Sequence, residues 1–243
     1  MESLENKVAI VTGASKGIGK GIAVALAKQG CKVILAARNG DKLAQAAAEI
    51  TEAGGSAQAV VTDVTDEQSV AELFTYVNEH HGRLDILVNN AGVAVSGRID
   101  ELSLSDWQQV QDVNVTGMFL CCRGAARLMK PQKSGRIINI GSISGQMPRV
   151  KSSPYTTSKF AVVGLTKALA VELRAYNIAV CAVHPGNVMT DIWEQSPQVP
   201  EQEGVMTVED LAEVVITVAS LPDNVNLFES VILPVSQPYL GRG

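Results

Sequence analysis

The sequence predicts an α/β domain built on a doubly wound, seven-stranded parallel sheet with helices on both faces. Short β-branched runs alternate with alanine-rich helical segments from the first residues onward. Strands separated by helices need crossover connections, which make neighbouring strands parallel and place helices on both faces of the sheet. The strands are also continuous apolar runs, as expected when both of their faces are buried.

The elements follow one another in a regular order. Predicted strands cover residues 8–11, 32–35, 59–61, 84–88, 136–140, 178–183 and 230–233, and predicted helices cover 17–30, 41–53, 66–80, a long region within 104–130, 155–176 and 207–220. No linker, repeat or low-complexity segment interrupts this series, so we expect a single domain over residues 1–243. Residues 187–206, rich in Pro, Gln and Glu, are the main irregular insertion and the expected substrate flap.

Composition narrows the classes of protein. Of the 243 residues, 46% are apolar and 19% are charged, which allows a sizeable buried core. A formal net charge of -5 argues against an extended nucleic-acid surface, and no apolar stretch reaches the roughly 18 to 20 residues of a membrane span. The four cysteines form no C-x-x-C pair, and we predict no metal site. We expect a cytoplasmic protein with buried, reduced thiols.

A glycine-rich turn follows the first strand and opens a helix. It consists of Thr12-Gly13-Ala14-Ser15-Lys16-Gly17-Ile18-Gly19. Glycines permit the tight turn and let the backbone approach a pyrophosphate at the positive end of the helix. The turn predicts dinucleotide binding by Gly13, Ser15, Lys16, Gly17, Ile18 and Gly19.

The end of the second strand selects the dinucleotide. It reads Ala36-Ala37-Arg38-Asn39, with no carboxylate before Asp41 to accept hydrogen bonds from a ribose 2′-hydroxyl. Arg38 offers a planar fork suited to a 2′-phosphate, and Lys16 adds a second charge. We therefore favour NADP(H) over NAD(H), although both side chains also fit ordinary solvated surface cations.

Seven landmarks occur in order, each at a strand end or in a helix. They are the glycine turn, Asp63-Val64, Asn89-Asn90-Ala91-Gly92, Asn114, Ser142, Tyr155-x-x-x-Lys159 and Pro185-Gly186. From about residue 5 to residue 190 the chain resembles the short-chain dehydrogenase/reductase family, and in particular its NADP-dependent 3-oxoacyl-carrier-protein reductases.

The resemblance implies a Rossmann-type fold and a set of cofactor-binding positions. Asp63 and Val64 would bracket the adenine, Asn90 would lie along the cofactor, and the hydroxyl of Thr190 would contact the nicotinamide amide. The remaining cofactor-binding positions implied are Ala91, Gly92, Tyr155, Lys159, Pro185, Gly186 and Val188. The resemblance further implies that Asn114 holds a water linking Lys159 to solvent, and that the protein forms a homotetramer or a homodimer.

The chemistry of Tyr155, Lys159 and Ser142 also follows from the residues themselves. Hydride transfer to a carbonyl leaves an oxyanion that needs a proton. An ammonium beside a phenol stabilises phenolate, and on a helix Lys159 reaches both Tyr155 and a ribose on the same face. The Ser142 hydroxyl can hold the carbonyl oxygen. We therefore predict Asn114, Ser142, Tyr155 and Lys159 as catalytic residues.

Each of these residues has an ordinary structural interpretation as well. Tyr155 after Pro154 fits a helix entry, Ser142 fits a turn, and Asn114 fits a kink among poor helix formers. The joint pattern favours catalysis, because all four lie at or beside the carboxyl ends of strands, where ligands bind in open α/β sheets. His184 is either a contact to cofactor or substrate, or a packed histidine at a strand end.

The expected substrate is an apolar or modestly polar ketone or 3-oxo compound, reduced to an alcohol. Segments 93–96, 143–150 and 189–206 should line its pocket, with Arg149 and Lys151 as the nearest cations. The tail from Leu233 to Gly243 departs from the usual carrier-protein reductases, which puts an acyl-carrier substrate in doubt. This tail either covers a pocket, its own or a neighbour's, or is a disordered end.

The sequence leaves open two alternative functions and two interpretations of one apolar helix face. The same residues serve an alcohol or hydroxy-acid dehydrogenase that works oxidatively, and the fold also suits a non-catalytic NADP(H)-binding regulatory protein. The apolar face with Met118, Leu120, Ala125, Leu128 and Met129 either forms a subunit interface or packs on the sheet.

Overall fold

The computed structural model describes residues 1–190 and 203–238, and its centre is one parallel sheet. Seven strands lie in the order β3-β2-β1-β4-β5-β6-β7, and every pairing is parallel. They are β1 (Val8–Thr12), β2 (Lys32–Ala37), β3 (Ser56–Val61), β4 (Ile86–Asn89), β5 (Gly135–Ile140), β6 (Ile178–Pro185) and β7 (Glu229–Ile232). The predicted fold class is confirmed, and the chain reverses direction across the sheet between β1 and β4.

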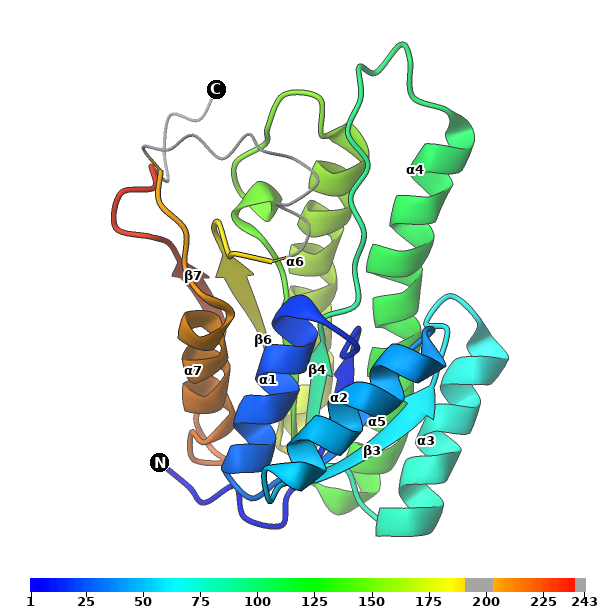
Figure 1. Cartoon of the computed structure of the whole chain (residues 1–243), viewed down its shortest axis with the longest axis vertical. Coiled ribbons are helices and arrows are strands. Elements are labelled where there is room, and N and C mark those ends of the chain that lie inside the picture. Colours follow the sequence, from blue (N-terminus) through cyan, green and yellow to red (C-terminus); the bar gives the residue numbers. More distant parts are fainter. Residues whose placement is uncertain (191–202, 239–243) are drawn as a thin grey trace.

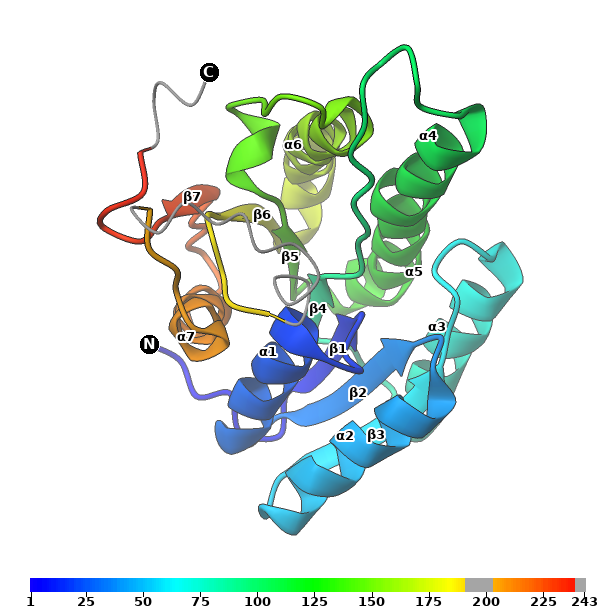
Figure 2. The same cartoon turned by 45° about the horizontal axis from the view of Figure 1, so that its top comes forward.

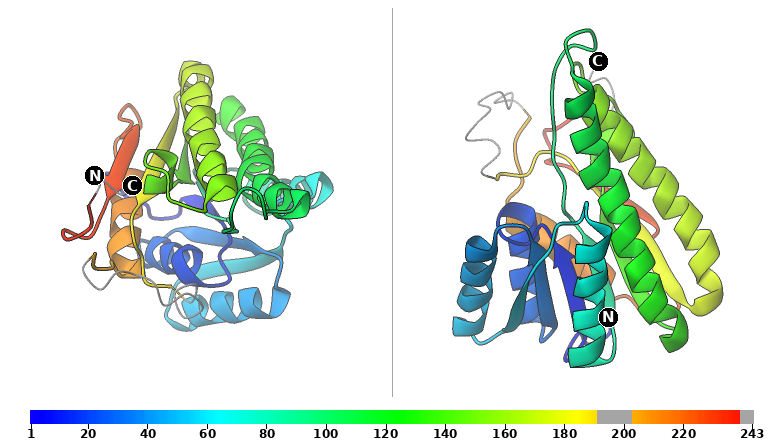
Figure 3. Two further views of the ribbon diagram at one scale, coloured as in Figure 1. Left: turned by 90° about the horizontal axis from the view of Figure 1, so that it is seen from above. Right: turned by 90° about the vertical axis from the view of Figure 1, so that its right-hand side faces the viewer.

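Helices cover both faces of the sheet. They are α1 (Gly17–Lys28), α2 (Gly40–Glu52), α3 (Glu67–His81), α4 (Leu104–Gln111), α5 (Gly117–Gln132), α6 (Ser153–Leu173) and α7 (Val208–Ala219). Helices α1, α2 and α7 lie on one face, and α3 to α6 lie on the other (Figure 3). The carboxyl ends of the strands all point to the upper end in Figure 1, where the long loops after β4, β5 and β6 gather.

The long helical region predicted within 104–130 is not continuous. Helix α4 runs into a π-helical turn, Asp112–Thr116, before α5 begins. The turn is closed by Gly117 N–H donating to the Asp112 carbonyl, five residues back. Its sequence, Asp-Val-Asn-Val-Thr, consists of poor helix formers, so little intrinsic preference opposes the wider turn.

Strand β3 begins three residues earlier than the apolar pattern indicates. Its first residues, Ser56-Ala57-Gln58, are exposed or half-buried, because β3 pairs only with β2 and lies at an edge of the sheet. An edge strand lacks the continuous apolar run of a buried central strand.

The apolar face of α5 packs on the sheet. Met118, Leu120, Ala125 and Met129 are buried in the chain's own core, with Leu128 packed against it. This excludes the interpretation of that face as a subunit surface. Instead α5 and α6 expose other apolar side chains, among them Phe119, Phe160 and Val171.

The four cysteines are buried and form no disulfide, as expected. Within the described ranges, no helix is long and apolar enough to cross a membrane. The same part of the chain holds no cluster of His, Cys, Asp or Glu able to bind a metal ion. Of the predicted flap, residues 191–202 lie outside the described residues, and so do tail residues 239–243.

Candidate active site

The predicted site residues gather at the carboxyl ends of the central strands. Their loops surround the point where the chain turns from β1 to β4, which is the crevice where open α/β sheets bind ligands. Figure 2 brings this end of the molecule forward, with the start of α1, the loop after β4 and the start of α6.

The glycine turn has the geometry of a phosphate site. Gly13 and Gly17 adopt φ values of +65° and +54°, which side chains rarely tolerate. At Gly19 a methyl group would lie 2.3 Å from the Gly13 carbonyl oxygen, so the helix start must lack a side chain there. Among the described residues, no side chain caps the first turn of α1, and no acid occurs within that turn, so its N–H groups and positive end suit an anion.

The ends of β1 and β4 are joined directly behind this turn. The Thr12 hydroxyl accepts hydrogen bonds from the backbone N–H groups of Asn90 and Ala91, each at 3.0 Å. The Asn90 carboxamide donates to the carbonyls of Thr12 (3.0 Å) and Gly13 (3.3 Å). Asn90 thus fixes the turn to β4, and the cradle fits a dinucleotide.

A cation follows β2, the strand that pairs with β1. Arg38 follows β2 directly and is exposed. It is close enough to Asp63 to influence that carboxyl: burial would raise the pKa of Asp63, but hydrogen bonds from Thr65 and the charge of Arg38 leave it below its usual value. Lys16, in the glycine turn, is also exposed. Arg38 and Asp63 therefore lie close together where β2 and β3 end.

Tyr155 and Lys159 lie in the first turns of α6. The Lys159 Nζ atom is 5.5 Å from the centre of the Tyr155 ring and donates to the Ile140 carbonyl at 3.0 Å. Lys159 is only 6% exposed, so its ammonium is held at the end of β5 rather than solvated. The structure brings the phenol and the amine together, and one Nζ donor is fixed by the strand.

Asn114 is buried in the π-helical turn and connects three elements. Its Oδ1 accepts from Val93 N–H (2.8 Å), and its Nδ2 donates to the Val93 carbonyl (2.9 Å) and to the Ser158 hydroxyl (3.0 Å). Ser158 in turn donates to the carbonyl of Tyr155 at 2.7 Å. The side chain of Asn114 therefore ties the loop after β4 to the helix that carries Tyr155.

Ser142 follows β5 and is held from behind by a histidine. Its hydroxyl accepts from Ser144 N–H at 3.1 Å, so it also stabilises the turn after β5, which was the structural alternative for this residue. His184 is fully buried, with Nδ1 against the backbone of Ser142 and Nε2 3.2 Å from Glu229 Oε1 in a poorly aligned contact. Of the two interpretations of His184, the structure supports the packed strand-end histidine.

The loop after β6 is packed against the tail. The backbone N–H of Asn187 donates to Gln237 Oε1 at 2.8 Å, and both residues are buried. Tail residues up to 238 thus fold onto the chain's own loop beside Pro185 and Gly186. On the other side of that loop, the methyl group of Thr190 lies near the backbone of Gly17, which places Thr190 beside the glycine turn.

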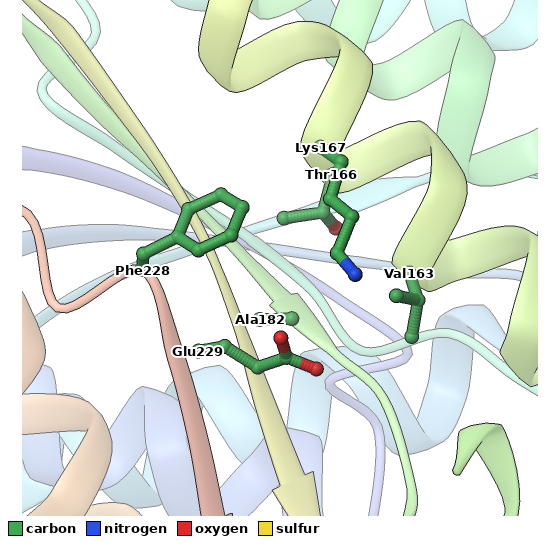
Figure 4. Close-up of a pocket in the computed structure, with 6 residues that line it drawn as sticks. All are labelled: Val163, Thr166, Lys167, Ala182, Phe228 and Glu229. Carbon is green, nitrogen blue, oxygen red and sulfur yellow. The ribbon is translucent and has the colours of Figure 1, made fainter.

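Three participants were absent from the sequence predictions: Ser158, Glu229 and Gln237. Ser158 sits between Tyr155 and Lys159, so its proximity was readable from helix spacing. Glu229 and Gln237 reach the site from the last strand and tail, and nothing local in the sequence points to them. Figure 4 shows Glu229 in a shallow pocket at the β7 edge, among Phe228 and residues of α6 and β6; apart from Glu229, its lining is separate from the site.

Comparison with known proteins identifies the family of the chain. Residues 7–200 match the family model described as short chain dehydrogenase. A 3-oxoacyl-[acyl-carrier-protein] reductase of Synechocystis sp. is 43% identical over 195 residues, covering 80% of this chain and 79% of that protein.

Two solved structures are similar over nearly the whole chain. A putative gluconate dehydrogenase from Agrobacterium tumefaciens has a TM-score of 0.90 at 32% identity, covering 96% of this chain and 97% of its own. A metagenomic short-chain oxidoreductase in complex with NADP has a TM-score of 0.83 at 35% identity, covering 96% and 97%.

Proposed function

The chain belongs to the short-chain dehydrogenase/reductase family of oxidoreductases, and from that membership we propose that it uses NADP(H) to reduce a ketone or 3-oxo compound to an alcohol. The observation that carries the proposal is the juxtaposition of Tyr155 and Lys159 at the carboxyl end of β5, with Ser142 at the end of the same strand. The proposal treats residues 1–243 as one domain with a flap at 187–206.

The bound dinucleotide supplies the hydride, and this chain's residues handle the oxygen and the proton. Tyr155 donates the proton to the oxygen of the reduced carbonyl. The Lys159 ammonium stabilises the phenolate that is left, because an adjacent opposite charge favours the ionised form. The Ser142 hydroxyl hydrogen-bonds the carbonyl oxygen and stabilises the charge that develops there.

Asn114 acts in this proposal mainly by position. In the described part of the chain its side chain bonds to Val93 and Ser158, so it holds the start of α6 in place. The relay water that the resemblance implies would then bind at the π-helical turn, where the irregular backbone leaves groups outside the usual helical pattern.

Selection of NADP(H) rests on Arg38 and Lys16. Arg38 is exposed at the end of β2 and no acid takes the place of a ribose partner there, which favours a 2′-phosphate. The NADP bound to the metagenomic relative is consistent with this choice. The binding residues proposed are those of the glycine turn, Asp63-Val64, Asn90 to Gly92, and Pro185 to Thr190.

A second function uses the same residues in the oxidative direction. The putative gluconate dehydrogenase among the structural relatives favours a hydroxy acid as the substrate of such a reaction. A non-catalytic regulatory role is less well supported, because Asn114, Ser142, Tyr155 and Lys159 are all present and placed together.

The proposed assembly is a cytoplasmic homotetramer, or a homodimer, that binds no nucleic acid or membrane. Phe119 on α5 and Phe160 and Val171 on α6 are exposed apolar side chains on two adjacent helices. Such a surface is suited to burial against a second copy.

A carbonyl panel assayed with NADPH and NADH tests the function. We expect oxidation of NADPH with at least one activated ketone, loss of turnover in Tyr155→Phe, and unchanged NADPH binding in that variant by fluorescence titration. Wild-type turnover retained by Tyr155→Phe would refute the role of the phenol.

A further inference from the structure

Arg149 lies in the segment that joins Ser142 to Tyr155. This segment leaves the short 3₁₀ turn Ile143–Gly145 and enters α6, and the Ser152 hydroxyl donates to the Arg149 carbonyl at 2.7 Å. The Arg149 side chain crosses to the loop after β6, where Nη2 donates to Asn187 Oδ1 at 3.2 Å. The guanidinium therefore spans two of the loops that surround the candidate active site.

The charge of Arg149 has no balancing anion in the described residues. Within 1–190 and 203–238 no carboxylate forms an ion pair with the guanidinium, and its Nε is buried without a hydrogen-bond partner. Burial lowers the pKa of Arg149, and Tyr155 opposes that shift, so the guanidinium and the phenol are electrostatically coupled. Arg149 is half-buried, and withdrawing a cation from water is costly unless the cation is paired.

The one side-chain acceptor that Arg149 has in the described residues is the neutral Asn187, and the carboxylate beside Asn187 accepts from Asn187 rather than from Arg149. Asn187 is neutral, and its Nδ2 is directed to Glu203 (3.0 Å) and to the Gly204 carbonyl (3.3 Å). Gln237, on the other side of Asn187, is 4% exposed, and in the described part of the chain its Nε2 has no hydrogen-bond partner. Two buried donors without acceptors thus flank Asn187.

We propose that Arg149 binds a carboxylate of the substrate, so that the reaction interconverts an oxo acid and a hydroxy acid. A guanidinium offers parallel N–H donors in a planar fork that matches a carboxylate, whereas a neutral ketone would leave the charge uncompensated. The inference rests on the proposed function and specifies its substrate class. The oxo acid gains a hydride at the carbonyl carbon and a proton at its oxygen, NADPH becomes NADP⁺, and the carboxylate is unchanged.

Matched pairs of acids and esters test this assignment. The probes are 2-oxobutanoate, 3-oxobutanoate and 4-oxopentanoate, each assayed beside its methyl ester with NADPH. The ester keeps the carbonyl and removes the charge, and it also stands in for an uncharged carrier thioester. We expect kcat/KM to favour the acid of at least one pair. Arg149→Gln should lower kcat/KM for that acid by about 10- to 100-fold, the effect of one charge-assisted hydrogen bond.

Two further variants separate recognition from general effects. Arg149→Lys keeps the charge without the fork and should fall between the wild type and Arg149→Gln. Lys151→Gln removes an exposed cation from the same loop and should leave the acid-to-ester ratio within about threefold of the wild type, because an exposed charge is screened by water. Far-UV circular dichroism and a thermal unfolding curve show whether Arg149→Gln is folded.

Binding provides a second measurement. Calorimetry of the hydroxy acid product with enzyme saturated by NADP⁺ should show a Kd raised about tenfold or more in Arg149→Gln. The inference is overturned if the wild type prefers the ester in every pair, if no acid is turned over while a neutral ketone is, or if Arg149→Gln lowers acid and ester equally. Failure to oxidise NADPH with any carbonyl would instead refute the proposed function.

Discussion

His184 contacts both polar groups of the Ser142 backbone through a single ring nitrogen. Its Nδ1 lies 3.3 Å from the Ser142 amide nitrogen and 3.2 Å from the Ser142 carbonyl oxygen. In the neutral form with hydrogen on Nε2, Nδ1 accepts from the amide, and Nε2 lies 3.2 Å from Glu229 Oε1, which accepts from Gln146 at 2.7 Å. The backbone that carries the Ser142 hydroxyl is therefore fixed by a buried side chain of the neighbouring strand β6.

His184 should make stability depend on pH. Burial lowers its pKa below the usual value; Glu229 and the Ser142 backbone oppose that shift, and Lys159 adds to it. The unfolded chain therefore takes up a proton near pH 6.5, before the folded chain does, so stability is lost as the pH falls from about 7 toward the lower folded pKa. Urea unfolding should show a steeper loss between pH 7 and pH 5 in the wild type than in His184→Asn, whose amide does not titrate. Parallel pH slopes would contradict this role.

Arg38 should determine cofactor choice. Arg38→Asp removes the partner proposed for a 2′-phosphate and supplies an acceptor for a ribose hydroxyl, so the ratio of kcat/KM for NADPH to that for NADH should fall about tenfold or more. Lys28→Asp makes the same change of charge at the end of α1 that lies away from the glycine turn. It serves as the control and should leave the ratio unchanged. If Arg38→Asp behaves like the control, the phosphate is bound elsewhere.

Asn114 should contribute to stability as well as to activity. Asn114→Ala removes the side-chain partners of the half-buried Val93 N–H and carbonyl, and it removes one of the two partners of the buried Ser158 hydroxyl. We expect the free energy of unfolding to fall by roughly 2 kcal/mol or more. Asn78→Ala, at an exposed position of α3, should change it by less than about 0.5 kcal/mol in the same urea titration. Equal effects of the two substitutions would exclude a bridging role.

Phe160 should help to hold the assembly together. It is 47% exposed on α6, and light scattering should show a tetramer or dimer for the wild type and a smaller species for Phe160→Asp. Ile99→Asp changes a more exposed apolar residue in the loop after β4 and should leave the mass unchanged. A monomeric wild type would rule out this interface.

Local patterns explain why most of the fold was readable in advance. The apolar runs of β1 and β2 and the glycine turn each indicate their local structure within a few residues. The pairing of Tyr155 and Lys159 is equally local, because residues four apart share one face of a helix. These local features were enough to predict the sheet and the central site residues.

Contacts between distant segments were not readable. Gln237 reaches Asn187 across 50 positions, and His184 meets Glu229 from the neighbouring strand β7. Neither pairing leaves a periodic signal, since each depends on where the last strand and tail come to rest. The edge strand β3 began early for a related reason: half of its surroundings are solvent, which removes the apolar pattern of a buried strand.

The π-helical turn Asp112–Thr116 determines how the helical segment from α4 to α5 responds to a change in chain length. One extra residue in a turn advances everything after it by about 100° relative to a regular α-helix. It lets Asn114 face Val93 and Ser158 while Met118, Ala125 and Met129 of α5 still face the sheet. Deleting a single residue there would restore a regular helix and bring these two surfaces out of phase, so this stretch should tolerate substitutions far better than deletions.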